Sequence, residues 1–161
     1  MLLFHRLLFS IHMNVSFPII LPSTTNNLFV FSQVKSNIMK QLTIQSEKLK
    51  VLARINESPT AKAIWDILPV SGPASVWGDE IYFSIPVKHS EADDAVAEVE
   101  VGTLAYWPPG SAFCIFWGPT PVSTSDKPKA YSPVNILGEI IGDATLFQSI
   151  KPGQIVTVSA S

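Results

Sequence analysis

The chain has 161 residues, which suits one ordinary domain, and its formal charge of −2 argues against a basic nucleic-acid footprint. Its single cysteine excludes a disulfide framework and a metal site built from several cysteines. Charge is unevenly distributed: 9 of the 11 basic and all 13 acidic side chains lie in residues 39–161, which gives that part a charge of −4. All 8 glycines and all 4 tryptophans also lie there. The sequence therefore predicts two segments, 1–38 and 39–161.

The first segment, residues 1–38, is predicted to be an N-terminal extension. Its early Arg6 and short apolar runs loosely fit an export signal, but His12 and Asn14 interrupt the apolar run and no clear cleavage site follows. The run is also too short and too broken for a membrane-spanning helix. We favour the alternative that translation starts at Met39 and that residues 1–38 are disordered or not natively translated. The expected location is the cytoplasm, or outside the cell if the extension is a genuine signal.

From Met39 onward, short strands alternate with turns, and two short helices interrupt them. Val51, Ala53 and Ile55 alternate with polar neighbours, as in a half-buried strand. Ser58-Pro59 supplies an N-cap and a first-turn proline for a helix. The full prediction places strands at 42–44, 49–55, 81–85, 97–101, 104–107, 113–117, 134–141 and 156–160, and helices at 58–68 and 143–150. The strand at 113–117 is apolar on both faces and should be central and covered on both sides.

These elements contain no repeated strand–helix–strand units, which favours a mainly β fold. A closed antiparallel β-barrel of about eight strands, with the two helices at its ends, is the expected solution, because closure removes exposed sheet edges. The one long irregular stretch, 118–133, carries four prolines. A loop of that length predicts a binding loop or a mobile flap.

The order of these elements resembles the cyclophilins. Leu49–Ile55 followed by a helix from Pro59 is similar to their opening strand and helix, and Phe113–Gly118 is similar to their apolar strand ending in Phe-Gly. The match is closer to an atypical bacterial and archaeal branch of small cyclophilin-like proteins of unsettled function. The segments that carry this closer resemblance are Trp77–Phe83, Tyr106–Gly110 and Pro133–Gly138. The resemblance covers essentially 39–161 and implies a cyclophilin-like barrel.

Cyclophilins isomerise prolyl peptide bonds with an Arg, a Gln and a His around an apolar proline pocket. The corresponding stretch 74–87 contains neither Arg nor Gln, the strand 113–117 has no His, and Arg54 falls on a surface position of the first hairpin. The resemblance therefore implies a module that binds a proline-containing peptide or a small molecule, with little isomerase activity. Two alternatives stay open: a weak isomerase or other enzyme using Glu80, Tyr82 and Asn135, and a structural domain that forms homo-oligomers.

Five residues are candidates for the ligand site: Glu80, Tyr82, Trp107, Phe113 and Asn135. Tyr82 alternates away from the apolar residues of its strand, and Trp107 ends a strand, so both can form an aromatic platform at a rim. Glu80 can carry out acid–base chemistry. Asn135 is a polar amide in an apolar strand and must find backbone or ligand partners. Phe113 belongs to the apolar strand that resembles the strand of the cyclophilins ending in Phe-Gly.

No cofactor, metal or nucleic acid is expected. The acidic loop at 89–94 has one histidine, His89, among flexible carboxylates, which is poor spacing for a metal. Cys114 lies between apolar neighbours with no histidine near it in the sequence, so we expect a buried core residue. Phosphate-binding, zinc-protease and serine-nucleophile motifs are absent from the sequence.

Overall fold

The computed structural model describes residues 39–161, and the predictions made for residues 1–38 lie outside this range. The described residues belong to one compact unit, Ile38–Ser161, and none of their helices is long and apolar enough to cross a membrane. The strands are β1 Lys40–Ser46, β2 Leu49–Ile55, β3 Val70–Pro73, β4 Ser75–Val76, β5 Glu80–Ser84, β6 Val96–Glu98, β7 Thr103–Trp107, β8 Ala112–Phe116, β9 Lys129–Ile141 and β10 Ile155–Ala160. The helices are α1 Pro59–Trp65 and two 3-10 helices, η1 Pro108–Gly110 and η2 Ala144–Ser149.

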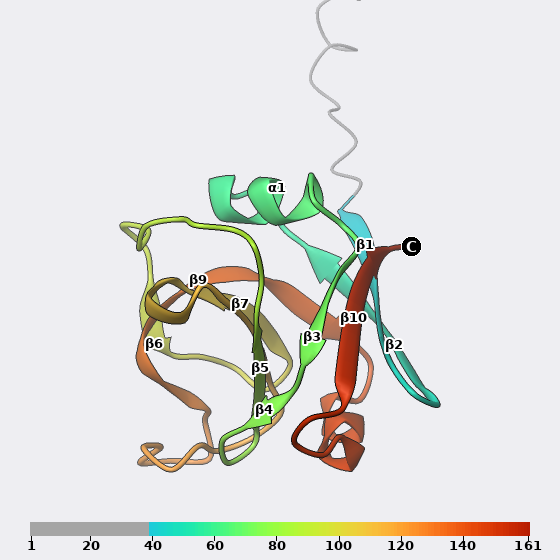
Figure 1. Cartoon of the computed structure of the whole chain (residues 1–161). Helices are drawn as coiled ribbons and strands as arrows, with labels where there is room; N and C mark the ends of the chain where they lie inside the picture. The colour runs from blue at the N-terminus through green and yellow to red at the C-terminus, as the bar shows by residue number, and fades with distance from the viewer. Residues whose placement is uncertain (1–38) are drawn as a thin grey trace, which may run out of the picture. The chain divides into compact units, whose positions relative to one another are not determined.

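The fold is mainly β, as predicted, but the predicted closed barrel is wrong. The antiparallel sheet runs in the order β3-β10-β1-β2-β9-β7-β8-β5-β4, with β6 paired to β9, so β3 and β4 are its two ends (Figure 1). These two end strands are consecutive in the chain and separated only by Ala74. β3 pairs with β10 and β4 pairs with β5. β3 and β4 do not pair with each other, because they are successive parts of one segment that pairs first with β10 and then with β5.

The helix α1 begins as its sequence predicts. The Ser58 side chain accepts a hydrogen bond from the Ala61 backbone N–H at 3.2 Å, and Pro59 occupies the first turn. Ala61 and Ile64 are buried in the core below. The helix ends at Trp65, earlier than expected, and lies at the end of the unit away from η2 (Figure 1).

Apolar side chains bury both faces of the sheet around β8. The main core lies on one face and contains Ile81, Phe83, Phe113 and Ile115. A second core on the other face is made of Val99, Ala105, Ala112, Cys114, Phe116, Ala130 and Val134. Every residue of β8 is buried, and β8 pairs with β5 on one side and β7 on the other. The predictions of a central strand covered on both faces and of a buried Cys114 are confirmed.

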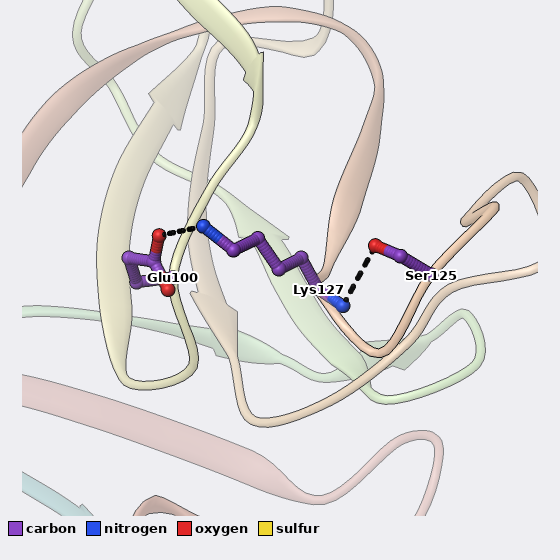
Figure 2. Close-up of polar contacts among 3 residues, drawn as sticks. All are labelled: Glu100, Ser125 and Lys127. Carbon is purple, nitrogen blue, oxygen red and sulfur yellow. Dashed lines mark hydrogen bonds and ion pairs between the residues drawn. The ribbon is translucent and has the colours of Figure 1, made fainter.

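The loop predicted at 118–133 is shorter than expected, because β9 begins at Lys129. The loop is attached to the rest of the unit near both of its ends, and one of these contacts is a hydrogen bond from the Val99 backbone N–H to the Pro128 carbonyl at 3.0 Å. The Asp79 backbone N–H donates to the Pro119 carbonyl at 2.9 Å. Near its other end, Lys127 forms an ion pair with Glu100, and its backbone N–H donates to Ser125 Oγ at 3.2 Å (Figure 2). Mobility of this loop stays a prediction.

Candidate functional site

A concave pocket of about 320 Å³ lies on the second-core face of the sheet, beside β5 and β7. Five side chains line it: Trp77, Glu80, Tyr82, Trp107 and Tyr131. We call this the aromatic pocket. Four of the five are aromatic and the fifth is a carboxyl, a mainly apolar lining with one polar group that is typical of small-ligand sites.

Strand alternation brings Glu80 and Tyr82 to this face. Ile81 and Phe83 point into the main core. Glu80 and Tyr82 alternate with them along β5 and therefore point to the other face. The register places Tyr82 opposite Cys114 on β8, and Cys114 in turn lies opposite Ala105 on β7. The floor of the aromatic pocket is therefore the second core.

The Trp107 indole is held in place from two sides. Its Nε1–H donates to Ser132 Oγ at 2.8 Å. On the other side, a Cβ added to Gly110 would meet Trp107 Cε3 at 2.5 Å, so the ring lies against the glycine backbone. One wall of the pocket is thus fixed by a hydrogen bond and by the absence of a side chain at Gly110.

Trp77 and Tyr131 form the opposite pair of aromatic residues. Their ring centroids are 6.3 Å apart with an interplanar angle of 72°, an edge-to-face arrangement that aromatic pairs favour. Tyr131 is 76% exposed, which is unusual for an aromatic ring outside a binding surface. Its strand, β9, starts two residues earlier, so Tyr131 stands at the edge of the pocket.

Among residues 39–161, Glu80 is the only charged residue that lines the pocket, and it is 6% exposed. Burial raises the pKa of its carboxyl from 4.5 to about 7, and a hydrogen bond with the Cys114 thiol opposes this rise only in part. Burial, followed by the Glu80 charge, also raises the pKa of the Cys114 thiol, which keeps it protonated. In residues 39–161 the two ion pairs are Arg54–Glu139 and Lys127–Glu100, and neither includes Glu80.

A family model described as Cyclophilin-like matches residues 40–159, nearly all of the described unit. The chain belongs to the cyclophilin-like family. The unit also resembles the solution structure of a hypothetical protein from Archaeoglobus fulgidus, with 35% identity and a TM-score of 0.66. That similarity covers 77% of this chain and 96% of the archaeal one. No curated protein matches the chain.

The cyclophilin-like unit brings together three of the five residues predicted for the site: Glu80, Tyr82 and Trp107. Phe113 does not line this pocket, because it is fully buried in the main core, where its ring lies 5.8 Å from that of Phe83. It stands on the same strand as Cys114 but points to the opposite face.

Asn135 lies away from the aromatic pocket, beside a wider depression lined by α1 and the acidic loop. Its Oδ1 accepts from the Ala92 backbone N–H at 2.8 Å, and its Nδ2 donates to the Ser90 carbonyl and to Thr60 Oγ1 at 2.9 and 3.0 Å. All of its polar atoms have protein partners, so the expected need for partners is met within the fold. Asn135 joins the loop to the start of α1.

The sequence reasoning missed Trp77 and Tyr131 as pocket residues. Trp77 was not a candidate because aromatic residues in β-barrels belong mostly to the core, and Tyr131 lies in the stretch 118–133 that is predicted as a loop. The alternation of Ala130, which is buried, with exposed Tyr131 marks the start of β9 and was the only local signal. Residues 39–161 hold no group of three His, Cys, Asp or Glu side chains arranged to bind a metal ion.

Proposed function

We propose that this cyclophilin-like unit is a ligand-binding module whose aromatic pocket takes a small molecule or the prolyl residue of a peptide. The single observation that carries the proposal is the convergence of four aromatic side chains and one buried carboxyl on a cavity of about 320 Å³. A cavity of this size is at the lower end of the range for small-ligand sites. A fixed indole such as Trp107 adds contact area without the entropic cost of ordering the side chain on binding.

The proposal includes little prolyl isomerase activity. Isomerisation by the residues of the isomerase cyclophilins needs a hydrogen-bond donor directed at the prolyl nitrogen. The aromatic pocket is lined by neither Arg, Gln nor His, and its carboxyl is an acceptor when ionised. The residues of the lining therefore support binding of a prolyl ring, but they do not support faster rotation about the prolyl peptide bond.

A titration with a prolyl peptide, succinyl-Ala-Ala-Pro-Phe anilide, tests this proposal. Trp77 and Trp107 line the pocket, whereas Trp65 belongs to α1. We expect saturable changes in tryptophan fluorescence that are reduced in Trp107→Phe, where Trp77 remains as a reporter, and kept in Trp65→Phe. Equal responses in the two variants, or a response that grows linearly with peptide, would contradict binding at this pocket.

A second candidate function is an enzyme that uses Glu80 as an acid or base. The observation in its favour is the pKa of about 7, since an acid–base group works best with a pKa near the working pH. Tyr82 lies on the same face and can orient a substrate, but Asn135, expected with them, lies elsewhere. A turnover that follows the ionisation of one group near pH 7 and is lost in Glu80→Gln would favour this candidate. Oligomer formation and a cytoplasmic location stay predictions.

A further inference from the structure

The lining of the aromatic pocket contains a negative charge and no positive one. Four aromatic rings, from β5, β7, β9 and the turn before β5, line the cavity together with Glu80. The face of an aromatic ring carries partial negative charge and attracts cations, and cages of several such rings recognise alkylated ammonium groups. The ionised Glu80 carboxylate and the faces of the four rings all favour a positive partner.

The Glu80 carboxylate has no cation of its own within the unit. Its residue is 6% exposed, and the ion pairs of residues 39–161 involve other acids. A buried carboxylate without a cation has lost its hydration without gaining a partner, which costs free energy. A bound cation would form an ion pair with the carboxylate and offset this cost.

The chemistry of the lining also limits which cation fits. A metal ion such as Ca²⁺ or Mg²⁺ needs about six oxygen ligands, and the pocket offers one carboxyl. A primary ammonium carries three N–H donors that need acceptors, whereas an alkylated ammonium has few or none and presents carbon to its surroundings. Carbon atoms on a cation suit aromatic walls.

We propose that the aromatic pocket binds an organic cation, an alkylated ammonium whose carbon atoms contact the rings of Trp77, Trp107 and Tyr131 while its charge faces Glu80. This inference rests on the proposed function and names the class of its ligand. A pyrrolidinium, as in a peptide that begins with proline, belongs to the same class as a trimethylammonium group.

Binding of such a cation must depend on pH through Glu80. The other ionisable groups next to it are Tyr82 on β5, Cys114 on β8 and Tyr131 on β9. β7 contributes Trp107, which does not ionise, and the Asp79 carboxyl lies over Gly118. The cation prefers the ionised carboxylate, so affinity should be highest above pH 7 and fall by up to tenfold for each pH unit below it.

Calorimetry with the full chain tests the inference, with choline as the cation and 3,3-dimethylbutan-1-ol as its neutral carbon analogue. At pH 8 we expect choline to bind at least tenfold more tightly than the analogue. At pH 6, binding should release close to one proton, measured from the dependence of the heat on buffer ionisation. Glu80→Gln should abolish the proton release and reduce the preference to what the aromatic rings alone provide, whereas Glu91→Gln, in the exposed acidic loop, should change neither.

Three results would overturn the inference. Equal affinity for choline and its neutral analogue at pH 8 would show that charge is not recognised. Binding of a neutral prolyl peptide without any binding of choline would leave the proposed function intact and remove this ligand class. If neither choline nor the prolyl peptide binds, both the inference and the proposed function are wrong.

Discussion

The Trp107 indole lies flat enough against Gly110 that a single added carbon on the glycine would come within 2.5 Å of indole Cε3 and of Cζ3. No real Cβ tolerates such a contact, so the glycine and the indole define each other's position. The backbone of Gly110 does not adopt a positive φ, so the constraint comes from space and not from backbone conformation. The wall of the aromatic pocket depends on this pair.

Gly110→Ala should therefore displace the indole and weaken ligand binding. We expect at least a tenfold loss of affinity for choline, with a folded protein. The measurement is the same calorimetric titration, with the Trp107 indole N–H signal in NMR spectra as a direct report of displacement. Gly153→Ala is the control, since it strains a turn at φ +87 with no atom within 4 Å of the new carbon. Unchanged affinity in Gly110→Ala would contradict this role.

Glu80 should make the folded unit less stable as pH rises. Its pKa is about 7 in the folded state and near 4.5 when unfolded, so the folded state holds its proton more tightly. The folded unit is most stable below pH 4.5, where Glu80 is protonated in both states. This stability is lost as the pH rises through 7, a change of about 3 kcal/mol in the free energy of unfolding. Urea unfolding at pH 5, 6, 7 and 8 measures it.

Glu80→Gln is the matched variant for this pH dependence, because it keeps the shape of the side chain and removes its titration. The natural chain should lose stability relative to the variant as the pH rises from 5 to 8, because only the natural chain has a carboxyl that ionises at this position. A constant difference across this range would show that Glu80 does not titrate with a raised pKa.

Asn135 should matter for stability and not for binding at the aromatic pocket. Asn135→Ala removes three hydrogen bonds and leaves the Ala92 backbone N–H without its acceptor, while the Ser90 carbonyl keeps its contact with His89 Nδ1. Losing buried polar partners typically costs 1–3 kcal/mol, so we expect a loss of about 3 kcal/mol and faster proteolysis at the acidic loop. Choline affinity should change less than twofold. A large loss of affinity in a folded Asn135→Ala would place this residue in the binding machinery after all.

A protease-coupled assay with a prolyl anilide should give the uncatalysed rate of isomerisation. The reason is the absence of Arg, Gln and His from the lining of the pocket. The assay is informative at high protein concentration, where weak activity is visible. Acceleration that rises with the amount of protein and is lost in Trp107→Phe would favour the isomerase alternative.

Local patterns were enough to predict the orientation of Tyr82 and the start of α1. The alternation of Ile81, Tyr82 and Phe83 placed Tyr82 opposite the core, and Ser58-Pro59 placed the start of α1. Such features depend on neighbours within a few residues, and sequence periodicity records them.

Features that depend on distant parts of the chain could not be predicted in the same way. The partners of Asn135 are 43 to 75 residues away, and nothing near the residue indicates which of them it would meet. β3 and β4 were missed because Gly72 and Pro73 lack strand character and the segment is defined by its pairing with β10 and β5. The open sheet follows from those same pairings.

The most direct test of the ligand-binding site uses the four indole N–H signals of the folded chain, assigned by single Trp→Phe substitutions. Two indoles line the aromatic pocket, whereas Trp65 lies in α1 and Trp117 is buried in the main core. Choline or the prolyl peptide should shift the signals of Trp77 and Trp107 saturably and leave those of Trp65 and Trp117 in place. Saturable shifts confined to Trp65 and Trp117, or none at all with either ligand, would contradict a binding site at the aromatic pocket.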